Sequence, residues 1–246
     1  MWKRLCLIGL ATLTLLLMGC GGGGGTSSTD PRIYFINASI DSGTLHFLMD
    51  DESAFAGAGY LGNSATFDAY EFKGADVDGW DVSVQDQTTA FAYDRIAHVF
   101  PSDTDNIVIS HGLVNFATGE EEKRIQLSVV SVNRTAPNGN KARLIVFHGL
   151  HRSPGNFTPS MVLKTPGQTA QFFTSDIAPG GNAVLNIDSG TQTLEAKRAD
   201  TTGIYATKTV NLDAGGVYLV IIGGIEGDPD VNRQPDIELI KLPAKA

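Results

Sequence analysis

Hydrophobic and polar residues alternate with a period of two along much of the chain beyond residue 31. Trp80, Val82 and Val84 alternate with polar side chains, which is the pattern of a strand with one buried face. No stretch keeps the 3.6-residue period of a helix, and clusters of Gly, Pro, Asn and Asp separate short segments of high β-propensity. The one candidate for a helical turn, residues 117–123, is better explained as a charged hairpin loop. The pattern therefore predicts an all-β fold.

Two segments, residues 144–147 and 217–222, are apolar at every position. A strand of this kind has no polar face to turn towards water, so it indicates a place inside a sheet that is covered on both sides. We expect both segments to be central strands.

Similar strand patterns recur in the two halves of the chain at a nearly constant spacing. The matching segments are residues 32–38 and 143–149, 106–112 and 216–222, and 125–127 and 237–239. A repeat of this length fits a small sandwich domain. We predict two tandem β-sandwiches, residues 31–134 and 141–243, each able to fold alone. Residues 135–140, with a Pro and an Asn-Gly pair, form the predicted linker.

Residues 1–19 have the three parts of a secretory signal peptide. Lys3 and Arg4 supply the basic start, residues 5–17 form an apolar run, and Gly19 is a small residue before a cleavage site. Spanning a bilayer takes about 20 apolar residues, so this run is too short for a transmembrane helix. We expect the signal peptide to be removed.

The residues around the cleavage site, Leu17-Met18-Gly19-Cys20, resemble the bacterial lipobox. The resemblance implies that the Cys20 sulfur carries a diacylglycerol group and that the new amino group is acylated too. An ordinary signal peptide that ends near a cysteine is the alternative. Residues 20–30 are rich in Gly, Ser and Thr and predict a flexible tether between the lipid and the folded part. Gly21, rather than Asp, after the cysteine favours the outer membrane.

Composition narrows the choice of partners. The formal net charge is −9, and removal of Lys3 and Arg4 with the signal makes the protein more negative by two units. Such a surface repels phosphate backbones, so nucleic acid is excluded as a partner, and the membrane is expected to be reached through the lipid alone. The two cysteines are Cys6, in the signal, and Cys20. The mature protein is therefore expected to have no disulfide and to depend on a hydrophobic core.

A family resemblance is clearest in the second half. It rests on residues 142–154, a strand that leads into a turn ending in Ser-Pro, and on residues 178–180, 194–197 and 212–220. These segments resemble the bacterial domain-of-unknown-function 4397 family, and residues 32–39, which end in Asn-Ala-Ser, are similar to a variant of its opening. The resemblance implies immunoglobulin-like or transthyretin-like sandwiches on cell-surface proteins. It supplies no catalytic residues.

One acidic loop has the beginning of a calcium site. Asp228, Asp230 and Asn232 stand in the Asp-x-Asp-x-Asn order, and a hard cation takes several oxygen ligands of this kind. Arg233 occupies the position where an EF-hand has Gly, and no Glu closes the loop. A solvated turn is the alternative, so calcium is a candidate ligand and no other cofactor is expected.

Two histidines raise the question of catalysis. His148-Gly149 follows an apolar strand, as in the oxyanion segment of an α/β-hydrolase, but no Gly-x-Ser-x-Gly string occurs in the chain. His148 and His151 would share a metal only if the chain turned between them, because positions three apart on a strand face opposite sides. We expect His148 to lie at a strand end, bonded to a nearby carbonyl, and we expect no catalytic residues.

The sequence favours a non-catalytic, lipid-anchored envelope or surface protein with a structural, adhesive or interaction role. The alternative is a glycan- or calcium-binding module, and an enzyme is less favoured. Tyr60, Tyr70 and Phe72 are candidates for a sugar-stacking platform, whereas Trp80 is expected in a core. A surface protein or glycan partner is expected on the acidic loops at residues 50–59 or 224–235.

Overall fold

The computed structural model describes residues 30–70, 79–152, 160–164, 176–200 and 203–245. The predicted signal peptide, Cys20 and Phe72 lie outside these ranges. No helix within them is long and apolar enough to cross a membrane. The fold is all-β, as the alternating pattern predicted. Residues 117–123 lie in a hairpin loop between two strands, as predicted, but their last three residues form a 3₁₀ turn, which the prediction had set aside.

The first half of the chain contains β1 (Arg32–Asn37), β2 (Leu45–Met49), β3 (Glu52–Ala58), β4 (Asp68–Ala69), β5 (Trp80–Asp86), β6 (Ala92–His98), β7 (Asp105–His111), the 3₁₀ helix η1 (Glu121–Lys123) and β8 (Gln126–Val132). The second half contains β9 (Lys141–His148), β10 (His151–Arg152), β11 (Met161–Lys164), β12 (Asn182–Asp188), β13 (Gly190–Arg198), β14 (Ile204–Leu212), β15 (Val217–Gly223), β16 (Ile225–Glu226), the 3₁₀ helix η2 (Val231–Arg233) and β17 (Asp236–Lys241).

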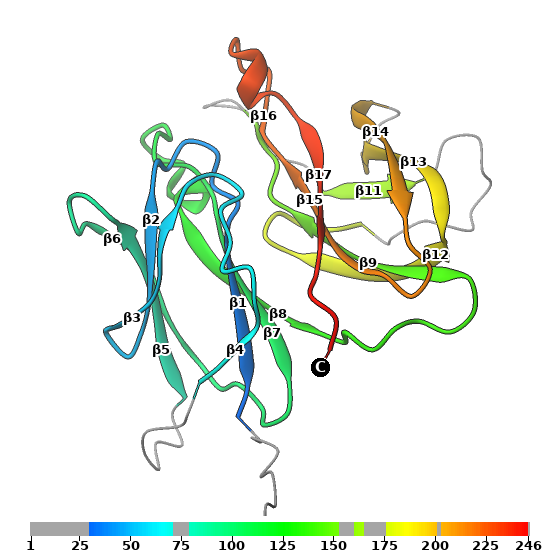
Figure 1. Ribbon diagram of the computed structural model, residues 1–246. Coiled ribbons are helices and arrows are strands. Elements are labelled where there is room, and N and C mark those ends of the chain that lie inside the picture. The colour runs from blue at the N-terminus through cyan, green and yellow to red at the C-terminus, as the bar shows by residue number, and fades with distance from the viewer. Residues whose placement is uncertain (1–29, 71–78, 153–159, 165–175, 201–202, 246) are drawn as a thin grey trace, which may run out of the picture.

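The main sheets stack in four layers, which Figure 1 shows from left to right. Outer sheet 1 has the order β3-β2-β5-β6 and inner sheet 1 the order β4-β1-β7-β8. Inner sheet 2 follows with the order β12-β9-β15-β17, and outer sheet 2 with β11-β13-β14. Strands β10 and β16 form a short separate pair. Each half is thus a β-sandwich, and the two inner sheets face one another.

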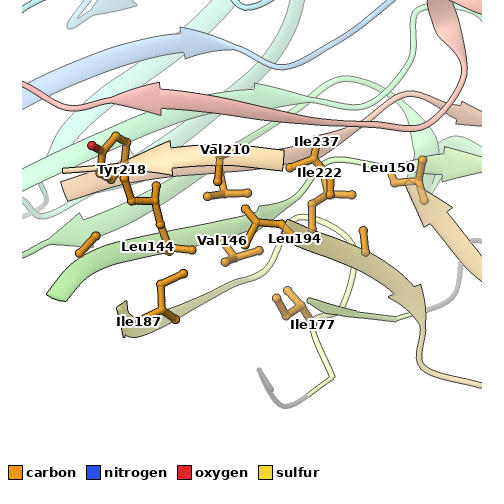
Figure 2. Packing of buried hydrophobic residues seen from close by; sticks show 14 residues of the cluster. Leu144, Val146, Leu150, Ile177, Ile187, Leu194, Val210, Tyr218, Ile222 and Ile237 are labelled. Atoms are coloured by element: carbon orange, nitrogen blue, oxygen red, sulfur yellow. The ribbon is translucent and has the colours of Figure 1, made fainter. Parts of the chain in front are cut away.

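Sandwich 1 closes around an apolar core between its two sheets. Phe35 of β1 packs against Phe47 of β2 with their ring centroids 5.3 Å apart, and Trp80 of β5 lies in the same core with 6% of its surface exposed. Trp80 is therefore buried, as its place in an alternating strand predicted. Sandwich 2 has an equivalent core, shown in Figure 2, in which Leu144 and Val146 of β9 meet Leu194 of β13.

A third apolar cluster, the interdomain core, fills the space between the two inner sheets. It consists of Tyr34, Ile36, Ala38, Ile107, Ile109, Val130, Val132, Ile145, Phe147, Val217, Leu219, Ile221 and Leu242. Along β15, Val220 and Ile222 face outer sheet 2, whereas Leu219 and Ile221 face the other half of the chain. The predicted central strands are therefore covered on both sides because a second domain supplies the second cover. Separating the halves would expose this cluster to water, so each half folded alone would carry an exposed apolar face.

The two halves share a strand arrangement. In each inner sheet the first strand pairs in parallel with the later central strand, β1 with β7 and β9 with β15, and a hairpin containing a 3₁₀ helix leads on to β8 or β17. The ladders place Arg32 opposite Asp105 and Arg143 opposite Val217. Segment 106–112 is therefore equivalent to 218–224, two residues beyond the predicted match. A slip of two leaves every side chain on the same face, so the alternating pattern could not reveal it.

One pair of glycines supports this register. Gly112 and Gly224 have φ angles of 110° and 105° and stand at equivalent ends of β7 and β15. A Cβ at either position would overlap the backbone of the returning strand, at Arg124 or Gln234. Both hairpins therefore require glycine at the same place.

Candidate functional site

The tip of the β2–β3 hairpin forms one wall of a concave site, here called the hairpin pocket. Asp50 and Asp51 form the turn, with φ angles of 49° and 63°. Two consecutive residues with positive φ are the signature of the tight hairpin turns that match the twist of the strands, and Asp tolerates this conformation. Asp50, Asp51 and Glu52 are exposed at this turn, and all three line the pocket.

Aromatic rings form the inner part of the hairpin pocket, whose cavity has a volume of about 490 Å³. Tyr70, just beyond β4, meets Trp80 of β5 edge to face, with their ring centroids 6.4 Å apart and an interplanar angle of 80°. Burial, with a smaller contribution from Asp68, raises the pKa of Tyr70 to about 12. Its hydroxyl therefore stays a neutral hydrogen-bonding group at any physiological pH.

Charge in the hairpin pocket is strongly acidic. Arg95 of β6 pairs with Asp81 at 2.6 Å and with Asp51 at 3.0 Å, and the Asp50 carboxylate accepts a hydrogen bond from the backbone N–H of Asp81. The hydrogen bonds to Asp81 and then Asp51 raise the pKa of Arg95. Four carboxylates line the cavity against this single guanidinium. The arrangement offers a ligand hydrogen-bond acceptors and the half-buried Tyr70 ring, which is backed by Trp80.

The hairpin pocket adjoins the start of the folded chain. Ala69, which lines it, is paired with Arg32, and the backbone N–H of Tyr70 donates to the carbonyl of Pro31 at 3.1 Å. The other predicted partner loop, residues 224–235, lies at the opposite end of the molecule, at the top in Figure 1. The structure therefore separates the two acidic loops that the sequence put forward together, and places Tyr70 beside the first of them.

The candidate calcium residues form a local turn between β16 and β17. The Asp228 carboxylate accepts from the backbone N–H of Asp230 at 2.8 Å, and the Asp230 carboxylate accepts from the backbone and side-chain N–H groups of Asn232, both at 3.0 Å. Arg233 lies 3.5 Å from Asp228. Among the residues that the structure describes, no three His, Cys, Asp or Glu side chains are grouped to hold a metal. Calcium at this loop stays a prediction to which the geometry adds no support.

His148 lies at the end of β9 and is fully buried, with its Nδ1 bonded to the carbonyl of Ile177 at 2.7 Å. This is the strand-end role that the sequence predicted. The chain does turn after His148, and His151 is buried as well, but the pair is part of no metal-binding group in the described residues. No sequence motif indicated that His111 would join them in the interface between the halves.

A buried ion cluster was also missed by sequence reasoning. Asp105, 3% exposed, pairs with Arg32 at 2.5 Å and with Arg134 at 2.9 Å, and the Arg134 guanidinium stacks 4.0 Å from the ring of Phe67. Arg134 also donates to the carbonyls of Pro243 and Ala244, which ties the seam between the halves to the end of the chain. Because the residues of this ion cluster come from distant segments of the chain, no local sequence motif predicts the cluster.

Comparison with known proteins identifies no relative by sequence: no family model matches the chain, and no curated protein matches it. Among solved structures, a proposed cell adhesion protein from Bacteroides ovatus is 10% identical, with 89% of this chain and 100% of that chain covered and a TM-score of 0.25. A family 26 carbohydrate-binding module from Eubacterium rectale, solved with maltoheptaose, is 11% identical, with coverages of 87% and 97% and a TM-score of 0.24. Scores this low carry no argument about ligands.

Proposed function

We propose that this protein is a non-catalytic, lipid-anchored binding protein of the cell envelope that recognises a polar ligand, with a glycan as the first candidate, in the hairpin pocket. The observation that carries the proposal is the meeting of the Tyr70 and Trp80 rings with the carboxylates of Asp50, Asp51 and Asp81 around one cavity. Ligand sites commonly combine an apolar floor with a few placed polar groups. If the ligand is part of another cell or surface, this binding would make the protein adhesive.

The chemistry of the hairpin pocket suits sugar hydroxyls. Carboxylates accept hydrogen bonds from hydroxyl groups, the Arg95 guanidinium donates them, and ring faces pack against apolar C–H surfaces. Arg95 also holds Asp51 and Asp81 in place before a ligand arrives. Such preorganisation lowers the entropic cost of binding.

The position of the pocket limits the size of the ligand if Cys20 is the anchor. The tether, residues 20–30, enters the fold at Pro31, beside the pocket. A Gly-rich coil of this length has a root-mean-square span of about 17–20 Å and, fully extended, about 36–40 Å. The pocket would thus stand close above the lipid and admit a chain-like or small ligand more readily than a bulky protein. Labelling with a fatty-acid probe, lost on Cys20→Ser, tests the anchor itself.

Binding is testable with a built-in reporter. After signal cleavage Trp80 is the sole tryptophan, so its fluorescence reports occupancy of the pocket it lines. We would titrate the mature chain carrying Cys20→Ser with a panel of envelope and surface oligosaccharides. Tyr70→Ala should weaken binding of any responsive glycan by about 5- to 150-fold, since stacking and hydrogen bonding of one buried aromatic are worth about 1–3 kcal/mol.

Phe91→Ala is the matched control. Phe91 is 63% exposed in the turn between β5 and β6, so the change removes an aromatic side chain without touching the pocket. It should leave the affinity unchanged. Equal losses in the Tyr70 and Phe91 variants, or no response from any oligosaccharide, would remove the basis for a glycan site here.

A further inference from the structure

Three histidines gather where the two halves of the molecule meet. His111 ends β7, His148 ends β9 and His151 begins β10, and their exposed fractions are 6%, 0% and 5%. The His111 ring meets Phe147 of the interdomain core edge to face, with the centroids 5.3 Å apart. The backbone N–H of Gly180 donates to the carbonyl of His148, and Gly180 packs directly under the His111 ring. Sandwich 1 thus presents one imidazole, and sandwich 2 two, to a common region.

The hydrogen bonds show which nitrogen carries a proton in two of these rings. Ser128 donates its hydroxyl proton to the carbonyl of Gly180, at 3.0 Å, so its oxygen must accept from Nε2 of His111, at 2.9 Å. This series of hydrogen bonds links His111 of sandwich 1, through Ser128, to Gly180 of sandwich 2. The carbonyl of Ile177 can only accept, so Nδ1 of His148 carries the proton. In their neutral forms His111 is therefore protonated at Nε2 and His148 at Nδ1.

The remaining ring nitrogens make no hydrogen bond of normal geometry in the described part of the chain. They are Nδ1 of His111 and Nε2 of both His148 and His151, and all three are buried. A proton added to Nδ1 of His111 or Nε2 of His151 would create a cation with no hydrogen-bond acceptor there, and unpaired buried charge is strongly unfavourable. At His148 the backbone of Ala178 and Leu150 favours the charged ring, but burial outweighs that effect.

The charged groups around the cluster do little to offset this. Asp94 of β6 attracts a charge on His111, but its carboxylate already accepts from the backbone N–H of Leu127 at 2.8 Å. Lys123 of η1, paired with Glu120, disfavours a charge on His151. Arg152, next to His151 in β10, is paired with Glu226 of β16 at 2.6 Å. No carboxylate stands ready for a second or third charged imidazole among these groups.

We propose that the contact between the two sandwiches is an acid-sensitive latch, closed while His111, His148 and His151 are neutral and released when they take up protons. Release would uncouple the halves and expose the interdomain core while each sandwich keeps its own core. The latch is independent of the hairpin pocket, which lies at the other end of sandwich 1.

The direction of the pH effect follows from proton linkage. Burial lowers the pKa of His111 and of His148 to about 4, and that of His151 to about 3. An imidazole freed into water has a pKa of about 6.5, so the open state binds protons more strongly than the closed state. The contact is therefore at full strength above about pH 6.5 and weakens progressively as the pH falls towards 4. Each imidazole that titrates raises the opening equilibrium constant by up to tenfold per pH unit.

Thiol labelling separates opening from unfolding. The mature chain with Cys20→Ser contains no cysteine, so a single Val130→Cys places a probe in the interdomain core and a single Val84→Cys places one in the core of sandwich 1. With a disulfide reagent that reacts in acid, labelling at position 130 should rise at least tenfold between pH 7 and pH 5, after correction for intrinsic reactivity. Labelling at position 84 should not change over that range. A parallel rise at both positions would mean global unfolding and would overturn the proposal.

Substitution of the histidines completes the test. Each of His111→Gln and His151→Gln, introduced with Val130→Cys, removes one titrating ring and should reduce the acid-induced rise by up to tenfold per pH unit. His46→Gln, in β2 of outer sheet 1, is the matched control and should change nothing. Far-UV circular dichroism and Trp80 emission at pH 7 identify which variants fold. One folded variant, His111→Gln or His151→Gln, is sufficient for the test. An undiminished rise in a folded interface variant would overturn the latch.

Discussion

The two halves share a strand arrangement but have different residues at equivalent positions. The comparison shows how each half accommodates buried polar side chains. Asn37 ends β1 where His148 ends β9. Every hydrogen-bonding group of the Asn37 side chain is engaged, because it donates to Ser42 and Ala58 and accepts from Ser39 and Ser110. His148 makes one side-chain hydrogen bond of normal geometry, from Nδ1 to the carbonyl of Ile177, and its Nε2 has no such partner among the described residues.

A second equivalent pair makes the same distinction. Asp105 at the start of β7 pairs with Arg32 and Arg134, whereas Val217, its equivalent in β15, is apolar and packs in the interdomain core. At these two positions sandwich 1 thus has polar groups that are hydrogen-bonded or ion-paired, whereas sandwich 2 has either a buried ring nitrogen without a partner or an apolar side chain. Saturated networks fix a structure, while an unsaturated buried base makes stability depend on pH.

The largest expected effect is at the ion cluster. Asp105→Asn leaves Arg32 and Arg134 without their carboxylate and should destabilise the protein by about 3–5 kcal/mol at pH 7, as for other broken buried pairs. Asp188→Asn, which breaks the exposed pair with Lys141, should cost less than about 1 kcal/mol. Urea unfolding followed by Trp80 fluorescence measures both. Similar losses in the two variants would show that Asp105 is not a stabilising centre.

The pH dependence of the Asp105 variant sharpens the contrast between the halves. Burial alone would raise the pKa of Asp105, but hydrogen bonds from Arg134 and Arg32 outweigh it and lower the pKa. Its stabilisation is therefore present above the ordinary carboxyl pKa of about 4 and is lost as the pH falls further. The difference between wild type and Asp105→Asn should thus disappear only in strong acid, whereas the histidine effect acts between about pH 6.5 and 4.

The same substitution at the equivalent strand ends gives the next largest effect. Asn37→Leu keeps the side-chain volume but strands four polar groups, so we expect a loss of about 2–4 kcal/mol at pH 7. His148→Leu strands only the carbonyl of Ile177 and should cost about 1–2 kcal/mol. At pH 5 the cost of His148→Leu should shrink, since the variant no longer takes up that proton on opening. A constant cost from pH 7 to 5 would contradict the contrast.

The sequence predicted the strands well and their partners less well. Alternation placed Trp80 in a core, and the apolar run at residues 217–222 required cover on both sides. The run does not indicate that its second face is covered by the other half of the same chain, because the hydrophobic effect is not specific to a particular partner. The register slip at 106–112 has a similar cause, since a shift of two preserves the pattern.

The candidate sites show the same limit. The acidic turn at residues 50–52 and Tyr70 were both singled out from the sequence, but only the fold brings them to one cavity with Asp81 and Arg95. The histidine cluster depends on His111 and Gly180, which come from different halves and belong to no motif. Motifs in the sequence reveal groups that are close along the chain, whereas both of these sites consist of groups from distant segments.

The smallest predicted effect tests the interface at a single contact. Gly180 and Gly139 have nearly the same φ angles, 72° and 70°, so Gly→Ala imposes similar backbone strain of about 1 kcal/mol at each. A Cβ at Gly180 would collide with the His111 ring, whereas a Cβ at Gly139 meets nothing within 4 Å. Gly180→Ala should therefore cost about 1–2 kcal/mol more than Gly139→Ala, through overpacking at the contact between the halves. In the Val130→Cys background, Gly180→Ala should also increase labelling at pH 7, while Gly139→Ala should not. If the two variants are equally stable and label equally, the His111 ring yields freely at this contact and cannot hold the halves together.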